Sequence, residues 1–336
     1  MGESCQGRRS ESAMIDDTTP AEVTPVISQR TVRLITFGGG YTLPAWVAER
    51  NGFFERHGIR VDITHTPDSV FLMTGLINGE FDIAVTAIDN LVAYQEEQGE
   101  VRVDAPVSLA AFMGVDDSFQ SLMAAPGVHR VEELRGRKIA VDALTTGYIF
   151  IIKEILARAG LSDTDVSYER TGGGPRRLQA MLGGEYAAGL LATPLDAVAA
   201  EQGFTCLGTA RGVLGHYQGR TGFARRPWIR QNREAVIAFM RGYRDAMDWL
   251  YEPSHRNEAT GLMCERDKAL TPELARRSLD ILLAESGGFT RDLALDFAGI
   301  QTVLDLRSRF GRPPKPMQAP SAYVDASLFQ EAFPAS

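Results

Sequence analysis

The stretch TVRLITFGGGYTLPAWVAERNGFFERHGIRVDITH, residues 31–65, decides the fold class. Its start predicts a β-branched strand over 31–37, followed by a glycine-rich turn and a helix. Pro44 fits near the first turn of that helix, because the N–H that a proline lacks would have no partner there. Gly58 ends the helix, and 59–65 form a second strand. A strand, a helix and a strand in this order make a βαβ unit, so the segment predicts an α/β protein with a parallel sheet.

The same alternation continues to about residue 210 and then gives way to helices. Further strands are predicted over 81–87, 106–113, 134–143, 166–171, 186–193 and 204–210. Further helices are predicted over 68–79, from Asp89, over 145–160, 172–184 and 194–203, and then over 230–252, 271–284 and 291–310. We therefore predict two α/β lobes, each a mostly parallel sheet flanked by helices.

The order of these elements divides the chain into four parts. We predict a disordered tail over 1–30, the first part of lobe I over 31–113, lobe II over 114–211, and a return to lobe I with C-terminal helices over 212–330. The chain would then cross between the lobes twice, near 112–117 and 211–217. Hinges consist of a few connecting residues of this kind, so we predict that the lobes close about these two crossovers.

Composition excludes several classes of protein. The chain has 336 residues, enough for about two domains of roughly 150 residues. Its charge of 35 − 43 = −8 argues against a non-specific nucleic-acid binder, and no apolar run is long enough for a membrane span. The three cysteines and five histidines show no metal-ligand spacing, so we predict neither a metal nor a cofactor. Cys206 and Cys264 are predicted to be small buried side chains, while Cys5 lies in the polar tail.

Candidate ligand contacts in lobe I follow the predicted strands. In open α/β sheets, ligands bind at the carboxyl ends of strands and against helix N-termini. The candidates after the first, second and third strands are Gly39, Gly40, Tyr41, Ser69, Thr86, Ala87 and Asp89. A helix cap is the favoured role for Asp89, and a ligand contact is the alternative.

Lobe II supplies a second set of candidates at its helix starts. These are Thr145, Thr146 and Gly147 before one helix, and Gly173 and Gly174 before the next. Free N–H groups at two helix N-termini favour an anionic group, and ordinary capping is the alternative. Arg176 and Arg177 are predicted to face solvent, although either one would suit a carboxylate or a sulfonate. No acidic residue is placed in this cleft by the sequence pattern.

Several segments resemble one known family. AWVAERNGFFERHGIRVDIT (45–64) and LINGEFDIAVTA (76–87) are similar to the N-terminal pattern of taurine-, aliphatic-sulfonate- and nitrate-type substrate-binding proteins, a broad family that includes the thiamine-pyrimidine-precursor proteins. Segments 134–168, 178–194 and 225–250 continue the match, which covers nearly the whole chain from Thr31 to about residue 330. The resemblance implies a two-lobe, periplasmic-binding-protein-like fold of type II, the Venus flytrap.

The resemblance also implies where the ligand and the partners bind. In this family the glycine loop, the helix starts of the second lobe and the turn at Thr193 and Pro194 line the cleft. His216, near the return crossover, is a further candidate, with a structural role favoured. The implied partners are a small-molecule ligand and an ABC permease with its ATPase, and we expect a monomer. The ligand itself is not identified.

The leading hypothesis is a solute-binding protein of an ABC-type uptake system that binds a small organic anion, such as a sulfonate or a carboxylate. The alternative is a cytoplasmic enzyme on the same fold, desulfinase- or decarboxylase-like, acting on a small aromatic or sulfur-containing acid. Desulfinases of this fold carry a cysteine in the first loop, and FGGGYTLP (37–44) has none. An effector domain of a LysR-like regulator would need an N-terminal helix-turn-helix, which 30 polar residues do not provide. No catalytic residue is assigned.

Two features of the sequence point to different cellular locations for the protein. The resemblance implies a periplasmic or other extracytoplasmic protein. Residues 1–30 lack the apolar core of a secretory signal, so the chain would be cytoplasmic if it begins at Met1 in the cell.

Overall fold

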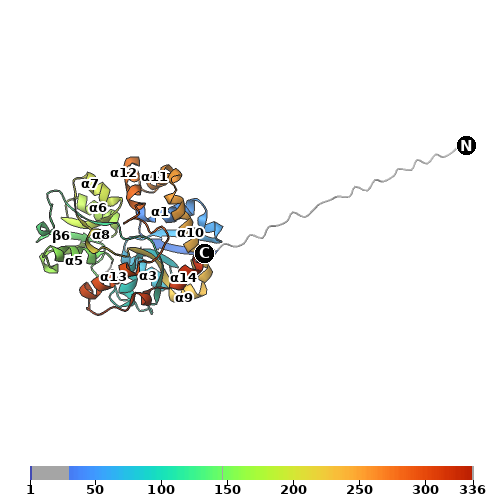
Figure 1. Ribbon diagram of the computed structural model, residues 1–336, viewed down its shortest axis with the longest axis horizontal. Coiled ribbons are helices and arrows are strands. Elements are labelled where there is room, and N and C mark those ends of the chain that lie inside the picture. The colour runs from blue at the N-terminus through green and yellow to red at the C-terminus, as the bar shows by residue number, and fades with distance from the viewer. Residues whose placement is uncertain (2–29, 146, 335–336) are drawn as a thin grey trace.

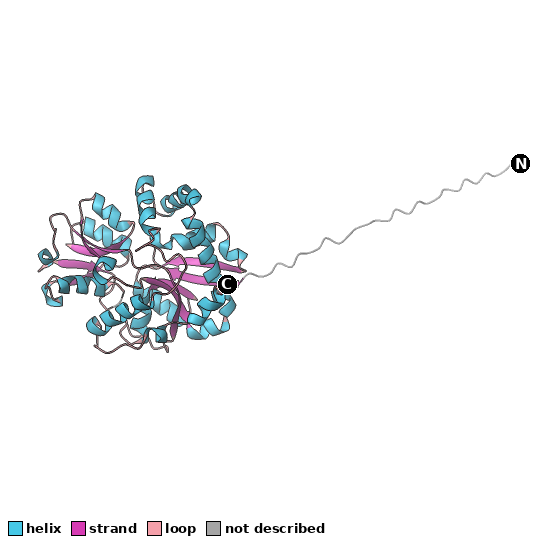
Figure 2. Cartoon of the chain, viewed as in Figure 1, coloured by secondary structure: helices cyan, strands magenta, loops and turns pink. Residues whose placement is uncertain are grey.

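The structure, a computed structural model, describes Met1 and residues 30–145 and 147–334. It contains two separate five-stranded sheets with helices packed around them (Figures 1 and 2). The predicted tail over 1–30 falls almost entirely outside the described residues, and Thr146 lies outside them as well.

The first sheet forms the centre of lobe I and has the strand order β2-β1-β3-β10-β4. Its strands are β1 (Arg30–Thr36), β2 (Ile59–His65), β3 (Ile83–Ala87), β4 (Leu109–Gly114) and β10 (Arg220–Arg225). β1 pairs in parallel with β2 and β3, as the opening segment of the sequence predicts. β10 runs antiparallel to both β3 and β4, so four of the five strands share one direction.

The second sheet forms lobe II and repeats this plan with the order β7-β6-β8-β5-β9. Its strands are β5 (Gln120–Ala124), β6 (Lys138–Val141), β7 (Ser167–Arg170), β8 (Ala188–Ala192) and β9 (Thr205–Thr209). β6 pairs in parallel with β7 and β8, and β5 is antiparallel to β8 and β9. The prediction of two mostly parallel sheets is confirmed. The two antiparallel strands, β5 and β10, were not predicted.

Helices cover both sheets. Those of lobe I are α1 (Leu43–Arg50), α2 (Phe53–Arg56), α3 (Ser69–Asn78), α4 (Ile88–Gln95), α9 (Arg226–Gln231), α10 (Arg233–Tyr251), α11 (Arg256–Arg266), α12 (Pro272–Leu282), α13 (Phe297–Phe310) and α14 (Ala326–Ala332). Those of lobe II are α5 (Ile149–Arg158), α6 (Gly174–Leu182), α7 (Leu195–Glu201) and α8 (Ala210–Leu214). Short 3₁₀ turns are η1 (Gly40–Thr42), η2 (Val131–Leu134), η3 (Asp163–Asp165), η4 (Pro253–His255) and η5 (Pro320–Tyr323). The predicted helix over 291–310 begins only at Phe297, and α11 was not predicted.

One hydrophobic cluster lies mainly in lobe I and reaches Ala192 of β8, and a second joins the lobes more extensively. The first packs α1, α2 and α10 together, and the rings of Phe54 and Phe239 stack with centroids 5.3 Å apart. The second contains side chains of α4 and α13 together with side chains of β6 and α5. Phe150 of α5 stacks on Phe310 of α13, with ring centroids 6.2 Å apart. The lobes therefore share an apolar contact along α5 and α13 (Figure 1).

A buried ion pair connects the two segments that link the lobes. The chain leaves lobe I after β4 and returns to it before β10. Asp116 lies in the first link, and its Oδ2 is 2.9 Å from Nη1 of Arg220, which begins β10. Oδ1 of Asp116 accepts from the N–H groups of Ser118 and Arg220, at 2.8 and 3.2 Å. The links overlap the segments predicted as hinges. Their motion, and the lobe limits drawn from the sequence, remain predictions.

Two further sequence predictions concern the burial of the cysteines and the absence of a membrane span. Cys206 was predicted to be buried, but it is exposed on β9, at the edge of the second sheet. Cys264 is half-buried against the first hydrophobic cluster. Within the described part of the chain, no helix has the length and hydropathy needed to cross a membrane.

Candidate functional site

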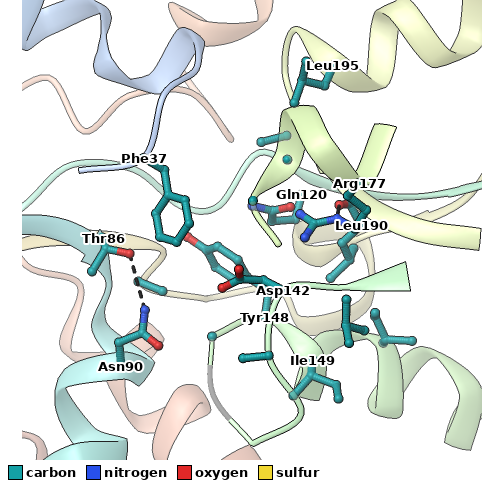
Figure 3. Close-up of a pocket in the computed structure, with 18 of the residues that line it drawn as sticks. Phe37, Thr86, Asn90, Gln120, Asp142, Tyr148, Ile149, Arg177, Leu190 and Leu195 are labelled. Carbon is teal, nitrogen blue, oxygen red and sulfur yellow. Dashed lines mark hydrogen bonds between the residues drawn. The ribbon is translucent and has the colours of Figure 1, made fainter. Parts of the chain in front are cut away.

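A cavity lies between the two lobes (Figure 3). Its lobe I wall consists of Phe37, Tyr41, Thr86, Ala87, Asn90 and Arg220. Its lobe II wall consists of Gln120, Ala140, Val141, Asp142, Ala143, Gly147, Tyr148, Ile149, Ile152, Gly173, Gly174, Arg177, Leu190, Ala192 and Leu195. Most of these residues lie at or just beyond the carboxyl ends of β1, β3, β6 and β8, where ligands bind in open α/β sheets.

Aromatic rings form the floor of the cavity beside a neutralised cation. The guanidinium carbon of Arg220 lies 3.6 Å from the ring centroid of Tyr41 and 5.7 Å from that of Tyr148. Burial lowers the pKa of Arg220, but Asp116 together with Tyr148 and Tyr41 outweighs burial and holds it above the ordinary value. Burial raises the pKa of Tyr41 to about 12, so this phenol is neutral, and it donates to the carbonyl oxygen of Gly38 at 3.0 Å. Arg220 therefore has its counter-ion in the protein and supports the rings.

Several polar atoms of the wall have no hydrogen-bond partner among the described residues. Oδ1 of Asn90 and Oδ1 of Asp142 are buried and accept no hydrogen bond. The Nδ2 group of Asn90 donates to Oγ1 of Thr86 at 3.4 Å, which leaves its oxygen directed away from Thr86 (Figure 3). Oε1 of Gln120 and Oη of Tyr148 are likewise buried without a hydrogen-bond partner in the described chain. Buried polar atoms are nearly always paired in folded proteins, so these four atoms offer hydrogen bonds to a polar ligand or to water in the cavity.

One acid and one base complete the wall. Arg177 of α6 is buried, and it donates from Nε to the carbonyl oxygen of Leu190 at 2.7 Å and from Nη1 to that of Gly172 at 3.0 Å. Its Nη2 has no acceptor within the described part of the chain. Asp142 follows β6; burial raises the pKa of its carboxyl, and Arg177 and Ser69 oppose that rise. Two sequence predictions are thus wrong: Arg177 is not exposed to solvent, and an acidic residue does face the cleft.

Six of the predicted contact residues do line the cavity. They are Tyr41, Thr86, Ala87, Gly147, Gly173 and Gly174. Gly173 brings the lobes together, because its N–H donates to the carbonyl oxygen of Pro67 at 3.3 Å, and a Cβ there would lie 3.2 Å from the ring of Phe37. Whether these residues touch a ligand remains a prediction.

The glycine loop lies at the rim. Gly39 and Gly40 line a neighbouring groove that is separate from the cavity wall. Gly40 packs directly on the other lobe, since a Cβ there would lie 2.9 Å from Cδ of Pro194 and 3.1 Å from the carbonyl oxygen of Thr193. Thr193 and Pro194 therefore contact the glycine loop, and neither belongs to the lining of the cavity.

Three other predicted contacts lie away from the cavity wall. Ser69 is buried near Asp142. His216 is exposed on the outside, with Nδ1 3.1 Å from Oδ2 of Asp296. Asp89 forms no side-chain cap either. It is fully buried against Arg307, with Nε to Oδ1 at 2.7 Å and Nη2 to Oδ2 at 2.6 Å.

Thr145 is occupied by the protein itself. Its N–H and its hydroxyl donate to Oε2 of Glu100 at 2.9 and 2.7 Å, and its carbonyl oxygen accepts from Nη2 of Arg307 at 3.0 Å. The N–H of Thr145, which the sequence assigned to a ligand anion, is thus bound to a carboxylate of lobe I.

Sequence reasoning missed five important wall residues: Phe37, Asn90, Gln120, Asp142 and Arg220. Asp142 had a usable signal, because it stands at the carboxyl end of a predicted strand. Gln120 and Arg220 begin the two strands that were not predicted, so nothing placed them at the cleft. Among the described residues, no group of three or more His, Cys, Asp and Glu side chains is arranged to hold a metal ion.

Solved structures with the same architecture are distant in sequence. A protein from Bordetella bronchiseptica RB50 superposes with a TM-score of 0.77 at 18% identity, covering 90% of this chain and 96% of its own. The periplasmic nitrate-binding protein NrtA from Synechocystis PCC 6803 gives 0.77 at 13% identity, covering 91% and 88%. The alkanesulfonate-binding protein SsuA from Xanthomonas axonopodis pv. citri, bound to MOPS, gives 0.71 at 16%, covering 88% and 98%. These likenesses confirm the predicted two-lobe, periplasmic-binding-protein-like fold.

Sequence comparison supplies the family. No curated protein matches this chain significantly. The family model described as NMT1/THI5 like matches residues 40–256, which is well over half of the chain and includes almost the whole cavity wall. The chain therefore belongs to the NMT1/THI5-like family.

Proposed function

We propose that this chain is the solute-binding component of an ABC-type import system and that it holds a small organic molecule in the cavity between its lobes. The observation that carries this proposal is the set of buried polar atoms without partners, contributed by both lobes to one cavity. A ligand that bridges the lobes would satisfy them and favour the closed arrangement. The solved relatives with this fold include a ligand-binding component of an ABC-type import system from Staphylococcus aureus and the periplasmic nitrate- and sulfonate-binding proteins.

The role brings partners and a location with it. A solute-binding component delivers its ligand to a permease that is driven by an ATPase, and it does so outside the cytoplasmic membrane. We therefore propose these two proteins as partners and an extracytoplasmic site of action for the chain, as a monomer. The enzyme alternative gains no support, because neither Cys206 nor Cys264 lines the cavity.

The wall chemistry refines the predicted anionic ligand. Nη2 of Arg177 suits a carboxylate or a sulfonate, because charge-assisted hydrogen bonds to guanidinium are strong. Oδ1 of Asp142 and Oδ1 of Asn90 are acceptors, so they require a donor such as an amino group or a ring N–H. We propose a ligand that carries an acidic group for Arg177 and a donor for Asp142, with an apolar body among Phe37 and the aliphatic side chains.

Matched sets of compounds test this proposal by thermal shift. Each set holds an acid, an amine and the compound that combines both on one scaffold, for example benzoate, aniline and 4-aminobenzoate, or propionate, propylamine and β-alanine. A ligand that binds only the folded state raises the midpoint of unfolding in proportion to RT ln(1 + [L]/Kd). We expect stabilisation by combined members and little by either partial member.

Substitution of the acid provides the control. In Asp142→Asn, the affinity for a combined compound should fall by roughly tenfold, the loss expected for one charged hydrogen bond, and the shift in the midpoint of unfolding should fall accordingly. Glu132→Gln, an exposed carboxylate of the same lobe, should change nothing. An acid that binds equally to wild type and to Asp142→Asn would show that the ligand needs no hydrogen-bond donor for Asp142. If no compound of any set stabilised the protein, the proposed ligand class would be contradicted.

A further inference from the structure

A carboxylate from lobe I is buried in a loop of lobe II. Glu100 lies between α4 and β4, and its side chain is 1% exposed. Its Oε2 accepts from the N–H of Leu144 at 3.1 Å and from the N–H and the hydroxyl of Thr145 at 2.9 and 2.7 Å. Arg170 of β7 pairs with its Oε1. Every one of these partners belongs to the second lobe.

A cation from lobe I holds the same loop from its other side. Arg307 of α13 is fully buried and donates through Nη2 to the carbonyl oxygen of Thr145 at 3.0 Å. Asp89, the counter-ion of Arg307, also receives a hydrogen bond from the N–H of Gly147. We call Glu100, Arg307 and Thr145 the interlobe tie. It engages all three backbone and side-chain polar groups of Thr145.

The tied loop carries part of the cavity wall. Asp142 and Ala143 come shortly before Leu144 and Thr145 in the sequence, and Gly147 and Tyr148 come shortly after them. The loop leads from β6 into α5, so its path fixes where the Asp142 carboxylate and the Tyr148 ring stand relative to lobe I. Glu100 itself is absent from the wall of the cavity, so it acts only through the loop.

We propose that Glu100 is a positioning residue that fastens Leu144 and Thr145 to lobe I and so assembles the cavity wall at Asp142 and Tyr148 before any ligand binds. Charge-assisted hydrogen bonds between a buried carboxylate and N–H groups are strong, and their loss leaves buried donors without partners. The inference goes beyond the proposed function, because it concerns contacts that the protein makes to itself and holds for any occupant of the cavity.

Amide-resolved hydrogen exchange on the full chain, without added ligand, tests the proposal. In Glu100→Ala we expect the amides of Leu144, Thr145, Gly147 and Tyr148 to exchange at least about tenfold faster, since opening of the loop no longer breaks charged hydrogen bonds. The strands of both sheets should keep their wild-type rates. Unchanged rates in the loop, or equal acceleration throughout both lobes, would overturn the proposal, the latter because Glu100 would then act on global stability alone.

Two further variants keep the test decisive. Thr145→Val loses only the hydroxyl bond to Glu100 and keeps the shape of the side chain, so it should show the same local acceleration to a smaller extent even if Glu100→Ala folds poorly.

Glu201→Gln is the matched control. Glu201 also crosses between the lobes, to Arg277 at 3.6 Å, but both side chains are about half exposed, and exposed pairs contribute little. Exchange in the loop should therefore stay at the wild-type rate, and acceleration there would contradict the specific role of Glu100. None of these results depends on a solute, so they stand apart from the thermal-shift test of function.

Discussion

Asp116 shows what a single side chain does at the junction of the lobes. It is fully buried and accepts hydrogen bonds from both linking segments while it neutralises Arg220. Arg220 in turn lies over the ring of Tyr41 at the cavity. Removing one partner of a buried pair costs more than the pair itself contributes, because the remaining charge is left without compensation. One residue thus connects the stability of the junction to the shape of the site.

We therefore predict that Asp116→Asn lowers the free energy of unfolding by about 3 kcal/mol, the range found for broken buried ion pairs. Urea denaturation monitored by circular dichroism measures this change. Asp62→Asn breaks an ion pair to Arg60 in which both side chains are more than half exposed, and it should cost less than about 1 kcal/mol. Equal losses in the two variants would show that the junction does not depend on the Asp116–Arg220 pair.

At the scale of elements, the site depends on how α6 begins. Gly173 precedes α6, and its position in lobe II faces Phe37 of lobe I. Its φ of −60° is open to any residue, so the requirement for glycine there is one of space alone. A Cβ would lie 3.2 Å from the Phe37 ring and 3.5 Å from the carbonyl oxygen of Pro67. A larger side chain would enter the gap between the lobes.

We predict that Gly173→Val weakens binding of any stabilising compound by at least about tenfold while it changes the midpoint of unfolding by only a few degrees, because the strain falls on the cavity and leaves the hydrophobic clusters intact. Titration calorimetry and thermal denaturation measure the two effects. Gly183→Ala, at the other end of α6, has a φ of −69° and only ordinary contacts, the nearest at 3.4 Å, and serves as the control. Unaltered affinity in Gly173→Val would place the ligand away from Phe37.

The strands show which parts of the fold the sequence could predict. The βαβ units have clear signals, such as β-branched runs closed by glycines, and their strands lie within a few residues of the predicted positions. β5 and β10 have none of these signals. QSLMA (120–124) is short, and RTGFAR (220–225) has an arginine at each end and a glycine inside. Both become strands because each lies between two others, β5 between β8 and β9 and β10 between β3 and β4, which is a tertiary effect.

The limits of the site prediction have the same physical origin. The strand-end rule led to Tyr41, Thr86 and Gly173, which line the cavity, since the rule follows from local topology. It cannot tell whether a helix N-terminus faces a ligand or a carboxylate of the other lobe. At Thr145 that partner is Glu100, which is distant in sequence and reaches it only when the lobes meet.

The whole molecule is held differently at the two sides of its cleft. At α5 and α13 the lobes share an apolar cluster and the interlobe tie. At α7 and α12 they meet through apolar side chains that are only partly buried, Ala197 and Val198, and through the exposed ion pair of Arg277 with Glu201 (Figure 1). Weak exposed contacts separate at lower cost than a buried interface. The molecule should therefore open at α7 and α12 and pivot near α5, α13 and the two linking segments.

We predict that this opening is visible between the two cysteines of the described chain, one on each lobe. Cys206 is exposed on β9 of lobe II and Cys264 is half-buried on α11 of lobe I, next to α12. With Cys5 replaced by serine, spin labels at Cys206 and Cys264 report one distance across the cleft. A compound that bridges the walls favours the closed state by its differential affinity, so the distance distribution should narrow and shift to shorter values at saturation. As a control, the distance between two spin labels that are both attached to lobe I should stay the same. An identical distribution with and without saturating compound would mean that the lobes form one fixed body and that the ligand enters without lobe motion.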